Sequence, residues 1–179
     1  MQLSNVGAGI VSVVVPDKEG NLADVALGYP DPMSYFGDGP CAGKVPGRYA
    51  NRIALGKFVL DGVEYTLPVN NGPNHLHGGP NGFQNKVWEC REHEGGVEFL
   101  YYSEEGEMGY PGALKAVARY DWSEDCELRL TLTAECDKPT VLNLTNHAYF
   151  NLNGEGSGTM LGHTLRMNCS EYLPTDQAQ

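Results

Sequence analysis

The distribution of glycine and proline constrains this chain more than any other feature. Among its 179 residues are 23 glycines and 11 prolines, which fall in short clusters between apolar runs. No stretch of a dozen residues shows a helical period without one of these breakers, whereas alternation of apolar and polar side chains is common. Short strands separated by frequent turns are typical of sandwiches and barrels. We therefore expect an all-β fold in one domain, residues 1–179.

The alternation locates a hairpin and three strands. The hairpin is predicted in residues 58–67, because Asp61-Gly62 between two β-rich arms favours a type I′ turn. The segment from Tyr29 to Val45 is rich in Gly, Pro and Asp, so we expect a loop that forms surface or site wall. Apolar residues recur at every second position at Val97, Phe99 and Tyr101, at Leu128, Leu130, Leu132 and Ala134, and at Leu165, Met167 and Cys169.

The charge balance argues against several partners. The chain has 12 basic against 23 acidic residues, a net charge of -11, which disfavours nucleic acid and anionic lipid. No apolar run reaches the ~20 residues of a membrane span, and the first residues lack the basic start of a signal peptide. Five cysteines without a CxxC pair fit free thiols in a reducing cytoplasm, although a disulfide between two of them stays open. A cytoplasmic location is therefore expected.

The most informative run is TVLNLTNHAYFNL, residues 140–152. Read as a strand, it has a polar, uncharged face that carries His147 and Tyr149. Hydrogen-bonding groups beside aromatic rings suit a sugar, whose hydroxyls need directional partners and whose CH face stacks on rings. The pattern also fits a histidine satisfied inside a polar strand, and the residues alone do not choose between the two. The opposite, core-like face comprises Leu142, Leu144, Ala148, Phe150 and Leu152.

A second polar cluster is NNGPNHLHGGPNGF, residues 70–83. An extended backbone would direct His75 and His77 the same way, and HxH can form half of a metal site. A metal needs at least a third ligand, for which only His147 is obvious, so no metal is expected.

A third cluster is GRYANRIALGKF, residues 47–58. Arg48 and Arg52 are most simply surface charges of an acidic protein. An arginine beside Asn51 could instead donate a planar fork of N–H groups to sugar hydroxyls.

Together and in this order, these motifs resemble the aldose 1-epimerase family. The resemblance covers essentially the whole chain and implies a large antiparallel β-sandwich, sometimes called a supersandwich. It further implies interconversion of the α and β anomers of free aldoses such as galactose and glucose, with a small sugar as partner and no metal or cofactor. It rests on SNVGAGIVSVVVPDKEGNLADVALGY, GRYANRIALGKFVLDGVEYTLPVNNGPNHLHGG, GFQNKVWE, EEGEMGYPGAL and DKPTVLNLTNHAYFNLNGEGSG.

The resemblance also implies roles for five residues. His147 of NHAYFNL would be the general acid, and His77 of NHLHGG would bind the substrate near its ring oxygen or hydroxyls. Asn51 and Arg52 of ANRI would line the sugar pocket, and Tyr149 would lie on the face of His147. A base would take the proton of the anomeric hydroxyl while His147 protonates the ring oxygen, and the ring would reclose on its other face.

The last residues depart from the family pattern. SEYLPTDQAQ resembles the middle of a family sequence, and the half that follows there supplies a sugar-binding Asp and the catalytic Glu. No residue here sits in those motifs, so neither role is assigned. Glu104, Glu105 and Glu107 are interpreted as solvated residues of an acidic loop. We expect the chain alone to lack epimerase activity and to self-associate or require a complementing chain.

Three other functions compete with this hypothesis. A β-sandwich could bind a sugar without converting it. A glycosidase usually needs two carboxylates that flank the bond, and residues 140–152 offer none. A relative acting on hexose 6-phosphates would need a basic phosphate site, which the net charge of -11 disfavours.

Overall fold

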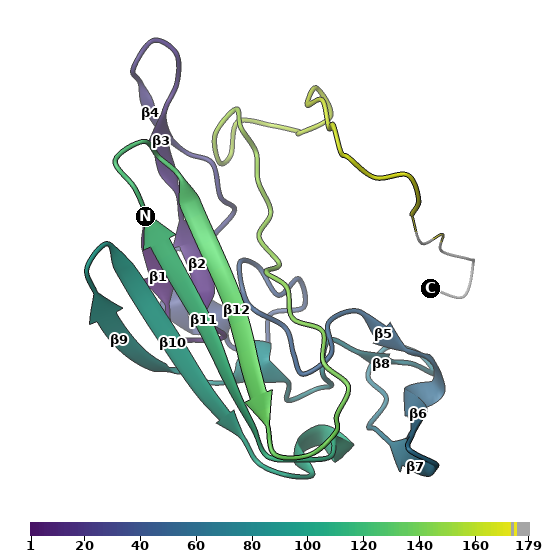
Figure 1. The fold of residues 1–179 in the computed structure, drawn as a ribbon. Coiled ribbons are helices and arrows are strands. Elements are labelled where there is room, and N and C mark those ends of the chain that lie inside the picture. The colour runs from purple at the N-terminus through teal and green to yellow at the C-terminus, as the bar shows by residue number, and fades with distance from the viewer. Residues whose placement is uncertain (173, 175–179) are drawn as a thin grey trace.

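The computed structural model of the chain describes residues 1–172 and 174. Its named elements are short strands and 3₁₀ helices, and the described residues contain no α-helix (Figure 1). All strand pairs are antiparallel, so the prediction of an all-β fold is confirmed. None of the described helices is long and apolar enough to cross a bilayer.

Most strands pair with a sequence neighbour. The 3₁₀ helices are η1 (Pro32–Tyr35), η2 (Ala54–Gly56), η3 (Phe83–Asn85) and η4 (Glu107–Gly109). The strands are β1 (Gln2–Ser4), β2 (Gly9–Ser12), β3 (Val14–Pro16), β4 (Leu22–Asp24), β5 (Arg52–Ile53), β6 (Lys57–Leu60), β7 (Val63–Thr66), β8 (His75–Leu76), β9 (Glu89–His93), β10 (Gly96–Ser103), β11 (Leu114–Trp122) and β12 (Leu128–Cys136). β5 pairs instead with β8, across the β6–β7 hairpin.

The largest sheet is a four-stranded meander in the order β12-β11-β10-β9. Its strands follow the chain order, so each pairs with its sequence neighbour (Figure 1). The register between β11 and β12 runs without a bulge from Leu114↔Cys136 to Trp122↔Leu128. Burial along β12 alternates at every residue, which confirms the period-two prediction for this strand. The predicted strand at residues 97–101 is present as β10, but its burial does not alternate, because the adjacent Phe99 and Leu100 are both buried.

The core lies against one face of this sheet. Phe99, Ala118 and Tyr120 are buried on that face in one cluster with Ala8 and Ile10 from the N-terminal segment. The Tyr120 hydroxyl donates to the Ala8 carbonyl oxygen at 2.7 Å, so the phenol reaches the N-terminal layer without leaving its polar end unpaired.

The predicted hairpin is confirmed. β6 and β7 pair from Lys57↔Thr66 to Leu60↔Val63, and the two turn residues, Asp61 and Gly62, have φ of 50° and 80°. Positive φ at both central residues is the requirement of the type I′ turn. The two turn residues were therefore sufficient to predict the hairpin from the sequence.

The strand predicted at Leu165, Met167 and Cys169 is wrong. Residues 164–169 form no strand, and all three side chains are exposed. A strand is stable only when its backbone groups have ladder partners, and no pairing with this segment occurs in the described residues. All five cysteines are free thiols.

The segment of residues 140–152 is extended but belongs to no named strand. Its backbone bonds two other segments: Ala50 N–H donates to Asn143 O at 2.8 Å, and Leu27 N–H donates to Tyr149 O at 2.9 Å. Two of the five residues predicted on the core-like face, Leu144 and Ala148, pack against the core, whereas the three others are exposed: Leu142 at 41%, Phe150 at 47% and Leu152 at 71%.

The loop of residues 29–45 is confirmed, but its end lies inside the protein. Lys44 is fully buried and forms an ion pair with Asp38. Its ammonium also donates to the carbonyl oxygen of Tyr35 at 2.6 Å. A buried charge is tolerated when it is paired and hydrogen-bonded, and this pair fixes the loop beside residues 43–50, where the candidate site begins.

Candidate functional site

His147 is held by backbone hydrogen bonds to the buried end of the loop. Its N–H donates to Lys44 O at 2.8 Å, and its carbonyl oxygen accepts from Gly43 N–H at 3.1 Å. The side chain is half-buried. Two backbone hydrogen bonds thus fix the position from which the imidazole projects.

Asn146 anchors this segment from behind, which the sequence patterns did not indicate. Its Nδ2 donates to Gly43 O at 2.6 Å and to the Tyr120 hydroxyl at 3.1 Å, while its Oδ1 accepts from Ala148 N–H at 2.8 Å. One amide therefore connects the His147 segment to the sheet and to the loop. Its adjacency to His147 in NHAYF was the only available signal.

His77 lies directly across from His147. The two ring centroids are 5.2 Å apart and the rings are nearly perpendicular, at 89°. The Asn51 N–H donates to Nδ1 of His77 at 3.0 Å, so in the neutral ring the proton sits on Nε2. Burial, then the charges of His147 and Arg52, lower the pKa of His77 to about 4. His77 therefore presents a neutral N–H donor at physiological pH.

Arg52 is oriented by two asparagines. Its Nε donates to Asn71 Oδ1 at 2.9 Å, and one Nη donates to Asn51 Oδ1 at 3.3 Å. A guanidinium has five N–H donors in a fixed fork, so these two bonds set the plane of the group and leave other N–H groups for a ligand. Asn71 is a functional candidate that the sequence patterns did not indicate.

Tyr149 completes the cluster on the other side of His147. The two ring centroids are 5.1 Å apart with an interplanar angle of 44°. The Tyr149 hydroxyl donates to Pro40 O at 3.1 Å, and the side chain is 41% exposed. The structure thus brings all five predicted residues into one contact chain, from Tyr149 through His147 and His77 to Asn51 and Arg52.

His75 does not join this cluster, so the prediction that it points with His77 is wrong. His77 has φ of 52°, which ends the extended geometry on which that prediction depended. His75 is fully buried; its Nδ1 donates to Pro68 O at 2.6 Å and its Nε2 accepts from the Tyr110 hydroxyl at 2.7 Å. The described residues contain no group of three His, Cys, Asp or Glu arranged to hold a metal.

Arg48 is a structural residue, so its interpretation as a surface charge is wrong. It is 2% exposed. Its guanidinium donates to Ser103 Oγ at 2.9 Å, to Pro111 O at 2.9 Å, and to the carbonyl oxygens of Ser103 and Glu104 at 3.1 and 2.8 Å. Burial lowers the pKa of Arg48. The planar fork joins the segment just before ANRI to the end of β10 and the loop that follows it.

Glu107 also departs from its sequence interpretation as a solvated residue. Its carboxylate pairs with Lys86 Nζ at 2.8 Å and accepts hydrogen bonds from the Ser103 hydroxyl and, at 2.7 Å, the Tyr101 hydroxyl. Burial acts to raise the pKa of Glu107, but the bonds from Lys86, Ser103 and Tyr101 outweigh it and the net pKa is lowered. Glu107 is therefore an internal, paired carboxylate. The interpretation holds for Glu104 and Glu105, which are exposed.

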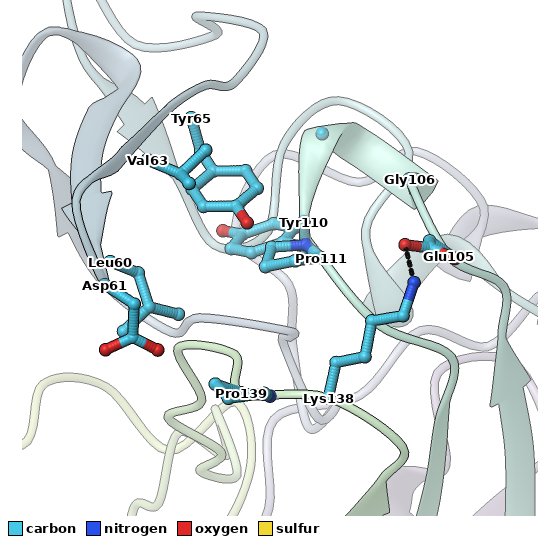
Figure 2. A pocket seen from close by; sticks show the side chains of 11 residues that line it. Leu60, Asp61, Val63, Tyr65, Glu105, Gly106, Tyr110, Pro111, Lys138 and Pro139 are labelled. Atoms are coloured by element: carbon cyan, nitrogen blue, oxygen red, sulfur yellow. Dashed lines mark hydrogen bonds and ion pairs between the residues drawn. The ribbon is translucent and has the colours of Figure 1, made fainter.

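A separate cavity of about 380 Å³ lies between the β6–β7 hairpin and the loop that contains η4. Figure 2 shows Tyr65 and Tyr110 on one side and the Glu105–Lys138 ion pair on the other. None of the five predicted residues lines this cavity. Its lining offers no pair of facing proton-transfer groups comparable to the two histidines, so we place the candidate site at the histidine cluster.

Known proteins share this sequence and arrangement. Residues 1–179 match the family described as Aldose 1-epimerase. The chain is 44% identical over 171 residues to galactose mutarotase from Bos taurus, covering 96% of this chain and 50% of that protein. It is 38% identical over 176 residues to aldose 1-epimerase from Escherichia coli K12, covering 98% of this chain and 51% of that protein.

Solved structures agree with the sequence matches. The crystal structure of the GalM/aldose epimerase homologue from C. elegans superposes with a TM-score of 0.81 at 39% identity, covering 85% of this chain and 47% of that chain. Galactose 1-epimerase from Lactobacillus acidophilus NCFM gives a TM-score of 0.72 at 32% identity, with 83% and 44% covered. The chain spans about half the length of the curated relatives it matches.

Proposed function

Because the chain belongs to the aldose 1-epimerase family, we propose that it supplies the acid-bearing half of a site that interconverts the α and β anomers of free aldohexoses such as galactose and glucose. The observation that carries this proposal is the facing pair His77 and His147, with ring centroids 5.2 Å apart. Arg52 and Asn51 lie on one side of the pair and Tyr149 on the other.

The neighbours of His147 suit a neutral, polyhydroxylated ligand. His77 offers an Nε2–H donor, because its Nδ1 is already occupied by the Asn51 N–H. Arg52 offers the N–H groups that Asn51 and Asn71 leave free. The half-exposed ring of Tyr149 offers a surface for the CH face of a sugar.

The proposed reaction needs proton transfer alone. A base removes the proton of the anomeric hydroxyl, the C1–O5 bond breaks, and His147 gives its proton to the ring oxygen. The open aldehyde rotates about C1–C2 and the former ring oxygen attacks its other face. His147 then takes back the proton while the base returns its own to the new anomeric hydroxyl. Neither a metal nor a cofactor takes part.

The base is the part of this mechanism that the described cluster does not provide. In the described residues, the side chains of His77, Arg52 and Tyr149 are hydrogen-bonded to a backbone N–H, two asparagine side-chain oxygens and a backbone carbonyl oxygen, with no carboxylate among them. Relatives are about twice as long as this chain. We propose that the base belongs to the part of the family sequence that this chain does not span.

Polarimetry of freshly dissolved α-galactose tests the proposal in two steps. The 179-residue chain alone is expected not to accelerate mutarotation beyond buffer, whereas a form completed with the remaining half of a relative is expected to do so. In that form, His147→Gln should lower kcat by about 10²–10⁴-fold, the usual contribution of one proton-transfer group. Arg52→Ala and His77→Ala should lower turnover without unfolding, with Arg91→Ala on β9 as a control.

Three outcomes would contradict parts of this proposal. A full rate from the 179-residue chain would place the base within it. Full activity of His147→Gln would remove the acid assignment, and full activity of both Arg52→Ala and His77→Ala would remove the binding assignments. Saturable galactose binding by the completed form without any rate enhancement would instead indicate a non-catalytic sugar-binding protein.

A further inference from the structure

Arg52 lies on a strand that does little to orient its side chain. β5 has only two residues and pairs with β8 through Arg52↔Leu76 and Ile53↔His75. The side chain of Arg52 is half-buried, so packing covers only part of it. Because arginine has several rotatable bonds, a ligand that binds the guanidinium loses affinity in immobilising it, unless the protein has already done so.

The turn NNGPN, residues 70–74, is fastened to neighbouring segments by asparagine side chains. Asn70 bonds both backbone groups of Leu76 on β8: its Oδ1 accepts from the N–H at 2.7 Å, and its Nδ2 donates to the carbonyl oxygen at 3.0 Å. Asn74 accepts at Oδ1 from the N–H of Leu55, in η2, at 3.1 Å. The turn is therefore anchored to both β8 and η2.

The backbone of Asn71 closes this turn. Its N–H donates to the carbonyl oxygen of Asn74 at 3.1 Å, and its own carbonyl oxygen accepts from the N–H of Asn74 at 3.0 Å. Gly72, next in the chain, has φ of 56°, and Pro73 restricts the backbone that follows. These constraints fix the backbone of Asn71, so its short side chain has few positions to choose from.

The side-chain oxygen of Asn71 accepts the shorter of the two hydrogen bonds that orient Arg52. The Nε of Arg52 donates to it at 2.9 Å, whereas the bond from one Nη to Asn51 Oδ1 measures 3.3 Å, and Asn51 is exposed. Since the guanidinium is planar, a bond at Nε sets the rotation of the whole group. Asn71 engages the single N–H of Nε and none of the four on the two Nη atoms.

From these contacts we infer that Asn71 is a positioning residue of the sugar site: it holds the guanidinium of Arg52 in its binding orientation before the ligand arrives. Asn71 acts through Arg52 and not through a contact of its own with the ligand. As a neutral amide it accepts one N–H, whereas a carboxylate at this position could take two parallel N–H groups. The inference rests on the binding role of Arg52 proposed above.

The first measurement reads the orientation of Arg52 directly and needs no enzymatic activity. In the 179-residue chain with isotope-labelled arginine, NMR gives the rate at which each Nε–H exchanges with water, and Arg52→Lys identifies the Arg52 signal by its loss. In Asn71→Ala this exchange should be about tenfold faster or more, because a hydrogen bond from a charged donor is lost. Asn85→Ala, the matched control, should leave it unchanged, since Asn85 is also half-buried but its side chain bonds Pro80 O, at 3.1 Å.

The second measurement separates positioning from a structural role. In the completed form described above, Asn71→Ala should raise KM for galactose about 2–12-fold and change kcat less, since the ligand must then order one long side chain. In an Arg52→Ala background the same substitution should have no further effect, because Asn71 acts through the guanidinium alone. If the completed form proves inactive, galactose affinity measured by calorimetry replaces KM.

A conservative variant covers the case in which Asn71→Ala fails to fold, which urea denaturation shows. Asn71→Asp keeps an acceptor oxygen of the same shape, so the Nε–H of Arg52 should still exchange slowly. Fast exchange in Asn71→Asp, unchanged exchange or unchanged KM in Asn71→Ala, or an effect of Asn71→Ala that persists in the Arg52→Ala background would each overturn the inference. Failure of the proposed function is distinguishable, because Arg52→Ala would then itself leave KM unchanged.

Discussion

Replacing His77 with asparagine should flatten the dependence of stability on pH. The pKa of His77 is about 4 in the folded chain and about 6.5 in an unfolded one. Between these values the unfolded chain binds a proton that the folded chain does not, so stability falls as the pH drops from about 6.5 towards 4 and the loss levels off below that. The difference of about 2.5 pKa units corresponds to about 3 kcal/mol.

Asparagine is suited to this test for two local reasons. Its Oδ1 can replace Nδ1 of His77 as the acceptor for the Asn51 N–H, which is 3.0 Å away. It also tolerates the left-handed backbone at this position, where φ is 52°. The substitution thus removes the titrating group while it keeps the fold and the hydrogen bond.

Urea denaturation of wild type and His77→Asn at half-unit steps from pH 4 to 7.5 measures the effect. Between pH 6 and 4.5 the slope of unfolding free energy against pH should be lower in the variant by up to about 1.4 kcal/mol per unit, the value for one proton. His75, whose pKa burial also lowers, keeps a similar dependence in both proteins and cancels in the difference. Identical slopes in the two proteins would refute the reasoning.

Other predictions follow from the same contacts. Arg48→Met should destabilise the chain by at least about 3 kcal/mol in urea, because it leaves the buried carbonyl oxygens of Ser103 and Pro111, and that of Glu104, without their charged donor; exposed Arg119→Met should have little effect. Gly78→Ala should cost at least about 3 kcal/mol more than Gly62→Ala, since both have φ near 80° but only the Cβ at position 78 would meet a backbone oxygen, at 1.6 Å. Elemental analysis of the purified chain should find no transition metal at unit stoichiometry; bound zinc that His77→Asn removes would contradict the proton-transfer site.

Features set by neighbouring residues were predictable from the sequence. Asp61-Gly62 determines its own turn through two positive φ angles, and the alternation of β12 matches its burial residue by residue. Leu165, Met167 and Cys169 show the same alternation and form no strand. The two segments differ in their hydrogen-bond partners, because β12 pairs with β11. The alternation within one segment does not show whether a partner strand exists.

The residues that form the candidate site were predictable from the sequence, but the contacts of the charged residues around it were not. The resemblance of NHAYFNL and NHLHGG to family motifs indicated His147 and His77, whose rings the structure places in T-shaped contact. Arg48 is buried because it finds acceptors at positions far along the chain. Glu107 is held by Lys86 on an earlier segment as well as by the nearby Tyr101 and Ser103. Charged residues can satisfy such long-range partners or remain in water, and their local sequence is the same in both cases.

The connectivity of the histidine cluster implies an order of folding. The meander joins only neighbouring strands between residues 89 and 136, and such local contacts close at low entropic cost. Residues 77 and 147 are 70 positions apart in the chain. The backbone of His147 is hydrogen-bonded to residues 43 and 44, which lie more than 100 positions earlier in the chain. Hydrogen-exchange labelling during refolding should therefore protect the amides of β11 before that of His147. Ribosome-bound chains that have exposed β12 but not residue 147 would already hold the sheet on which the two imidazoles later meet.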